Sequence, residues 1–203
     1  EGLEDAIATA KDDGGAVFAA TDHVTLREFG EAEHADEEEG EHAHGPEDPH
    51  IWMDPIAMRD VALALAPVLT RDLGLELDKR PADLDARLAA LDAEIREGLS
   101  AIPEARRKLV TGHESMGYFA DRYAFELIGT VVPGPSSQGE VSAGEMAEIR
   151  RTIESTGVPA IFAEIGTPAA VVEAIAAATG ARVVELPTHI VPDDGSYETF
   201  VRG

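Results

Sequence analysis

Apolar side chains recur at helical spacing in two long stretches of the chain. In the second stretch they lie three or four residues apart, at Leu84, Leu88, Leu91, Ile95 and Leu99. This pattern predicts one long amphipathic helix over residues 81–101. The first stretch begins at Asp54-Pro55, an N-cap residue followed by a proline, and its apolar face continues to about Leu73.

The residues before these helices divide into an ordered part and a polar part. Residues 1–30 predict a helix, a break at Gly14-Gly15, a short strand around Ala16–Ala20 and a turn. Acids and histidines dominate residues 28–48, which hold almost no large apolar side chain. Such a segment buries too little apolar surface to order itself, so we predict an acidic, His-rich loop.

Beyond Pro103 the pattern changes to alternating strands and helices. Strands are predicted at residues 108–111, 126–132, 158–163 and 182–186. The helices between them are predicted at 115–123, at 142–157 with a capping box at its start, and up to 179, where Gly180 follows. This order predicts an α/β fold with a mostly parallel sheet covered by helices.

The two ends of the chain are therefore predicted to be separate α/β lobes. Residues 1–80, with the acidic loop 28–48, form what is present of an N-terminal lobe, and residues 102–203 form a C-terminal lobe. The long helix at 81–101 would join them.

Charge and composition narrow the classes of function. The formal net charge is −24 with 16 Lys and Arg residues, which argues against nucleic acid or an anionic membrane as partner, because both require a basic face. The chain has no cysteine, so any metal site must use His, Asp, Glu or water. No apolar run is long enough to span a membrane, and the first residues lack the features of a signal peptide.

Three of the seven histidines stand where an α/β fold tends to place functional groups. His113 and His189 follow predicted strands, and His50 shortly precedes a capped helix. Ligands of open parallel sheets bind beyond the carboxyl ends of the strands, so the three imidazoles could converge in a cleft and hold zinc, manganese or iron. The alternative for any single histidine in a loop is an exposed or hydrogen-bonding side chain.

Other candidates have more ordinary interpretations. His34, His42 and His44 lie in the acidic loop, where they are either solvated or capture zinc weakly and transiently. Glu164 ends a predicted strand; it is either a ligand or an acid, or, more commonly for such a residue, a hydrogen-bond partner of a neighbouring loop. Aromatic and sulfur side chains expected to pack core or cleft walls are Trp52, Met53, Tyr118 and Phe119.

Several segments resemble the zinc- and manganese-binding solute-binding proteins of bacterial ATP-driven metal importers, the adhesin-like metal-binding lipoprotein family. The most specific motif is segment 48–55, which reads DPHIWMDP. Further matches are segments 112–119, 161–164 and 195–197. The resemblance implies two lobes with parallel sheets covered by helices, joined by one long rigid helix, and a metal bound between them by four side chains.

The resemblance also implies which residues bind the metal. His50 and His113 match family ligands, and His189 stands in the region of the family's fourth ligand, usually an Asp. The alternatives for that ligand are Asp194 and Asp193, followed by Glu164. The family's first ligand, its signal peptide and its opening strands have no counterpart here, so we expect an N-terminally truncated chain.

The function implied is high-affinity, extracytoplasmic capture of a divalent metal and its delivery to the membrane permease of an importer, without enzymatic activity. We expect zinc rather than manganese, because the acidic His-rich loop resembles that of zinc-type members. We also expect a monomer in the periplasm or at the cell surface, with any lipid anchor on the missing N-terminus.

Two other classes of function remain open at this point. One is a zinc hydrolase in which Glu164 or Glu114 activates a metal-bound water, although Gly117 stands where an H-E-x-x-H motif needs its second histidine. The other is an extracellular adhesion or interaction module that uses the acidic run to bind a partner.

Overall fold

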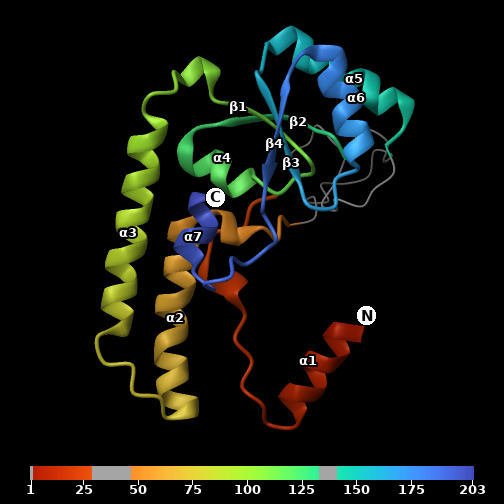
Figure 1. Cartoon of the computed structure of the whole chain (residues 1–203). Helices are drawn as coiled ribbons and strands as arrows, with labels where there is room; N and C mark the ends of the chain where they lie inside the picture. Colours follow the sequence, from red (N-terminus) through yellow and green to blue (C-terminus); the bar gives the residue numbers. More distant parts are fainter. Residues whose placement is uncertain (1, 29–46, 133–140) are drawn as a thin grey trace. The chain divides into compact units, whose positions relative to one another are not determined.

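The computed structural model describes residues 2–28, 47–132 and 141–203 (Figure 1). The chain divides into two compact units, Glu1–Thr25 with Pro55–Asp92, and Leu26–Asp54 with Ala93–Gly203. The predicted loop histidines His34, His42 and His44 lie outside the described residues. The predicted division into lobes at 1–80, 81–101 and 102–203 stays a prediction.

Within the described residues, the regular elements of the first unit are all helical. Its elements are α1 (Gly2–Asp12), the 3-10 turn η1 (Ala20–His23), α2 (Pro55–Leu73) and most of α3 (Arg80–Leu99). The proline start of α2 and its end before Gly74, at φ +64°, confirm the predicted bounds. Leu88 and Leu91 of α3 are almost fully buried, as the leucine spacing predicts.

The short strand predicted around Ala16–Ala20 is wrong. Residues 15–19 are irregular, and Ala20 already belongs to η1, which packs against α2. A short apolar run becomes a strand only when its backbone finds a partner, and the described residues of this unit contain no strand with which it could pair.

The second unit contains a four-stranded parallel sheet in the order β2-β1-β3-β4. Its strands are β1 (Lys108–Thr111), β2 (Glu126–Thr130), β3 (Ala160–Glu164) and β4 (Arg182–Leu186). β1 and β4 have the predicted bounds, whereas β2 ends two residues earlier and β3 begins two residues later than predicted. The predicted α/β class with a parallel sheet is confirmed.

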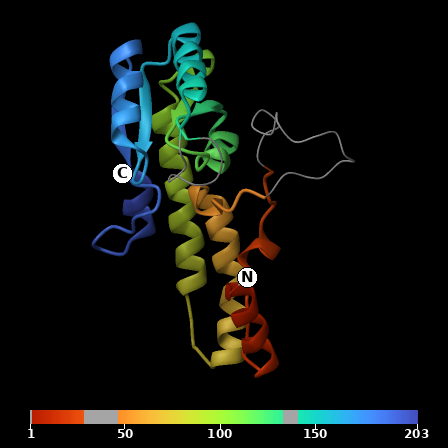
Figure 2. The ribbon, with the colours of Figure 1, turned by 90° about the vertical axis from the view of Figure 1, so that its right-hand side faces the viewer.

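Three helices of the second unit contact this sheet: α4 (Gly117–Tyr123), α5 (Ala143–Thr156) and α6 (Ala169–Thr179). The short α7 (Tyr197–Arg202) follows β4 in the chain and was not predicted from the sequence. The capping box between Ser142 and Glu145 is present, and Gly157 ends α5 at φ +66°. Figure 2 shows α5 (teal) and α6 (blue) running side by side, and both helices contact the sheet.

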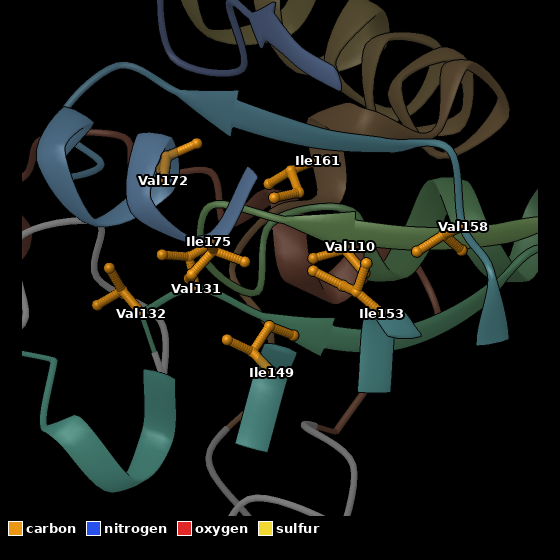
Figure 3. Close-up of a cluster of buried hydrophobic side chains, with 9 residues drawn as sticks. All are labelled: Val110, Val131, Val132, Ile149, Ile153, Val158, Ile161, Val172 and Ile175. Carbon is orange, nitrogen blue, oxygen red and sulfur yellow. The ribbon is translucent and has the colours of Figure 1, made fainter. Parts of the chain in front are cut away.

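The core of this unit fills the space between α5, α6 and one face of the sheet (Figure 3). Its buried side chains are Val110, Val131, Val132, Ile149, Ile153, Val158, Ile161, Val172 and Ile175. All nine are aliphatic and β-branched, which suits strands covered by helices. The core holds the sheet firmly while the carboxyl ends of its strands stay available for polar side chains.

The strand order has a consequence for those carboxyl ends. After β1 the chain goes to β2 on one side, whereas β3 and β4 lie on the other side of β1. In open α/β sheets the crevice at such a reversal is the usual ligand position. The ends of β1 and β3 are therefore where a site is expected.

No helix within the described residues is long and apolar enough to cross a membrane.

We predict that Ile161→Ala lowers the free energy of unfolding by about 2–5 kcal/mol, because it opens a cavity at a fully buried position of the core. Urea unfolding of both proteins measures the difference. Ile165→Ala is the matched control, since that side chain is 58% exposed and its loss should cost far less. Equal losses for the two variants would contradict this description of the core.

Candidate metal centre

Three imidazoles converge in the second unit. The ring centroids lie 5.3 Å apart for His50 and His113, 5.6 Å for His50 and His189, and 5.1 Å for His113 and His189. One nitrogen of each ring lies within 4.8 Å of the others, so one ion could contact all three. His50 and His113 are buried and His189 is exposed.

A buried carboxylate orients His50. Asp48 is 1% exposed, and its Oδ1 accepts hydrogen bonds from the backbone N–H of His50 at 2.9 Å and from Nδ1 of the ring at 2.7 Å. Because Nδ1 then carries the proton, Nε2 keeps its lone pair and is the nitrogen available to a metal. The 3-10 turn η3 (Ile51–Met53) follows directly and leads to the start of α2.

A second buried carboxylate orients His113 across the reversal in strand order. Glu164, the last residue of β3, is 4% exposed. Its Oε2 accepts from the His113 backbone N–H at 2.8 Å and lies 2.5 Å from Nδ1, while its Oε1 accepts from the Ser115 hydroxyl. Gly112 makes this approach possible, since a Cβ there would lie 2.7 Å from Oε2 and would also collide with Thr167.

His189 follows β4 and is held differently. Its Nδ1 lies 2.8 Å from the hydroxyl of Thr188, a residue that is itself 1% exposed. The pKa of His189 is lowered from its ordinary value, chiefly because the surrounding protein removes water from the ring and secondly because His113 and His50 lie nearby. The neutral form that a metal requires is therefore favoured.

Arg27 and Tyr118 also contact Asp48 and hold it in place. The Arg27 guanidinium lies 3.6 Å from Asp48 Oδ2, and the Arg27 carbonyl accepts from the Asp48 backbone N–H at 2.7 Å. The Tyr118 hydroxyl accepts from the Arg27 N–H and donates to the Asp48 carbonyl, and burial raises the pKa of that phenol. Gly117 again permits a close approach, because a Cβ there would lie 2.7 Å from Asp48 Oδ2.

The other predicted site residues are placed away from the three imidazoles or have another partner. Glu164 hydrogen-bonds the loop that carries His113, which is the more common role expected from its sequence position. Asp194 accepts hydrogen bonds from Ser196 N and from the Thr199 hydroxyl at the start of α7, and Asp193 is exposed beside it. Neither aspartate belongs to the group of converging ligand atoms found in the described residues.

The roles of Asp48 and Arg27 were not predicted from the sequence. Asp48 had a detectable signal, because an acid two residues before a candidate histidine ligand can bind both its backbone and its ring. Arg27 had no such signal in the sequence. It contacts Asp48 because the segments before and after residues 29–46 pair through their backbones. The assignment of His50, His113 and His189 as the metal ligands stays a prediction.

Comparison with known proteins identifies the family of this chain. The model of the family described as zinc-uptake complex component A, periplasmic (ZnuA), matches residues 1–203. The zinc-binding protein TroA of Treponema pallidum (strain Nichols) is 35% identical over 155 residues, which are 72% of this chain and 48% of TroA. The chain spans about half the length of that relative.

Solved structures show the same fold. A mutant of the laminin-binding adhesin Lmb from Streptococcus agalactiae matches with a TM-score of 0.77 at 22% identity, covering 96% of this chain and 71% of that chain. The periplasmic zinc-binding protein TroA from Treponema pallidum matches with a TM-score of 0.71 at 26% identity, covering 97% of this chain and 71% of that chain. The predicted fold of metal-type solute-binding proteins is thus confirmed, and the chain belongs to the ZnuA family of periplasmic zinc-uptake components.

Proposed function

We propose that this chain captures zinc outside the cytoplasm and delivers it to the membrane permease of an ATP-driven importer. The observation that carries the proposal is the convergence of His50, His113 and His189. Membership of a family described as periplasmic zinc-uptake components supports the transport role. We propose that the protein acts as a monomer.

The chemistry of the three side chains favours zinc over manganese. Imidazole nitrogens suit zinc, whereas manganese prefers carboxylate, carbonyl and water oxygens. Three histidines supply three of the four positions of a tetrahedral zinc ion and leave the fourth for water or another side chain. Asp48 and Glu164 lie behind two of the rings, where their negative charge offsets part of the charge of a dication and raises the basicity of Nε2.

Exposure differs among the ligands in a way that suits capture and release. His50 and His113 are 2% and 1% exposed and form the fixed, buried side of the site, whereas His189 is exposed. Zinc would therefore enter and leave past His189. Binding then occurs at a site where two ligands are already oriented by buried carboxylates.

The described residues give the hydrolase alternative little support. Both oxygens of the Glu164 carboxylate accept hydrogen bonds, from His113 and from Ser115, so this group is committed to orientation and is poorly placed to activate a metal-bound water. We therefore propose capture without chemistry. The likeness to a laminin-binding adhesin concerns the fold, and no observation in the described residues favours an adhesion module.

Replacing any of the three histidines should weaken zinc binding. We predict that His50→Ala, His113→Ala and His189→Ala each weaken it by more than about 100-fold, since even loss of an outer-shell partner costs 10- to 100-fold. Calorimetric zinc titration with a competing chelator measures the dissociation constants. His23→Ala is the control, because that exposed ring stacks on Phe18 in the first unit. Unchanged stoichiometric binding in His50→Ala and His113→Ala would refute the proposed site.

The two orienting carboxylates provide a separate prediction. Glu164→Gln and Asp48→Asn should each weaken zinc binding about 10- to 100-fold, because an amide of the same shape carries no charge to support the imidazole. The same titration measures the effect. Glu185→Gln on the neighbouring strand β4 is the matched control, since its side chain is exposed. If it weakened binding as much as Glu164→Gln, general electrostatics of this acidic chain would explain the loss.

A further inference from the structure

His189 is the ligand with the weakest local support. It has a hydroxyl beside Nδ1 where His50 and His113 have buried carboxylates. It follows β4, which lies at the edge of the sheet, and the next two residues, Ile190 and Val191, are 47% and 72% exposed. The position of this ligand therefore depends on what tethers its loop.

Trp52 contacts that loop directly. Its indole Nε1–H donates a hydrogen bond of 2.9 Å to the carbonyl of Thr188, the residue before His189. Its ring stands edge-on to His189 at 5.7 Å between centroids and edge-on to His50 at 5.2 Å. One side chain thus touches two of the proposed ligands and is bonded to the backbone beside one of them.

Trp52 is itself held in place from both sides. Its carbonyl accepts a 2.8 Å hydrogen bond from the Tyr197 hydroxyl of α7. The turn that contains it follows His50 and ends at Asp54, whose carboxylate accepts two hydrogen bonds from Arg122, at 2.8 Å and 2.5 Å. A movement of the indole would therefore be resisted by the same turn that positions His50.

The space beside the indole makes this tether important. A hollow of about 400 Å³ is lined by Trp52, His189, Ile190, Val191, Tyr197 and Phe200. The loop after β4 is therefore not packed tightly on that side, and side-chain packing alone restrains it weakly. A directional hydrogen bond to Thr188 supplies the restraint that packing does not.

We propose that Trp52 is a positioning residue that holds His189 against His50 and His113, so that zinc meets three ligands already in place. This inference rests on the proposed zinc capture and extends it. Because His189 is held in place before the ion arrives, less conformational entropy is lost on binding. The indole also offers a direct readout, because the chain has one tryptophan.

The test compares Trp52→Phe, which keeps an aromatic ring but loses the N–H, with Tyr197→Phe, which loses the hydroxyl that anchors Trp52. We expect zinc affinity to fall roughly 10-fold or more in Trp52→Phe and less in Tyr197→Phe, with faster zinc dissociation in both. Affinity is measured on the full 203-residue chain by competition with a chelator. The visible absorption of the Co²⁺-loaded protein reports the ligand geometry and should change in Trp52→Phe.

Phe119→Leu is the matched control for lost aromatic packing, since Phe119 contacts Tyr123 and Phe125 rather than the imidazoles. It should lower thermal stability and leave zinc affinity and the Co²⁺ spectrum unchanged. In Tyr197→Phe, where the indole is retained, its ¹H–¹⁵N signal should exchange with solvent faster than in the unaltered protein. This signal keeps the proposal testable if Trp52→Phe does not fold.

Two results would overturn the proposal: wild-type affinity and Co²⁺ spectrum in Trp52→Phe, or a loss of affinity that Phe119→Leu reproduces. His189→Ala separates this failure from that of the proposed function. If His189→Ala weakens zinc binding while Trp52→Phe does not, only the positioning role fails. If the unaltered chain binds no zinc, the proposed function and the positioning role fail together.

Discussion

The hydrogen bond between Glu164 and the ring of His113 joins the end of β3 to the end of β1. A carboxylate that is 4% exposed requires strong partners, because removing its water is costly unless donors replace it. Here the donors are the backbone and ring of His113 and the hydroxyl of Ser115. The close approach excludes a side chain at position 112, so the glycine, the strand order and the orientation of the imidazole belong to one arrangement.

A buried carboxylate also orients His50, but other residues hold that carboxylate in place. Asp48 lies two residues from its histidine and is supported by Arg27 and Tyr118, which reach it from other segments of the second unit. Two unrelated local structures thus give the same result, an imidazole whose Nδ1 faces a buried carboxylate and whose Nε2 is available. His189 departs from this pattern. Its loop leaves an edge strand, borders a hollow, and is connected to the others mainly through the indole of Trp52.

This asymmetry fits a protein that has to release what it binds. In the proposed site, the two buried ligands would set affinity and selectivity, while the exposed His189 would set how readily the ion enters and leaves. The exposed apolar residues Ile190 and Val191 lie in the same loop, so the proposed ligand with the weakest local support also lies in the most solvent-exposed part of the site.

Sequence patterns predicted the regular elements well where the signal was local. The bounds of β1 and β4, the capping box of α5 and the leucine face of α3 follow from spacing and from single residues with known backbone preferences. The short strand at residues 16–20 was wrong and α7 was missed, because a few apolar residues do not reveal whether a backbone partner exists.

By itself, the sequence determined the α/β class and nominated His50, His113 and His189, because strand ends and helix starts can be read from local pattern. The tertiary structure alone decided that Glu164 lies behind His113 rather than beside it as a further ligand, and that Trp52 connects His50 to the loop of His189. The first contact joins two residues that are 51 positions apart in the chain, and the second joins two that are 136 positions apart. Their formation depends on strand order and on glycines that permit close approach, which no local pattern encodes.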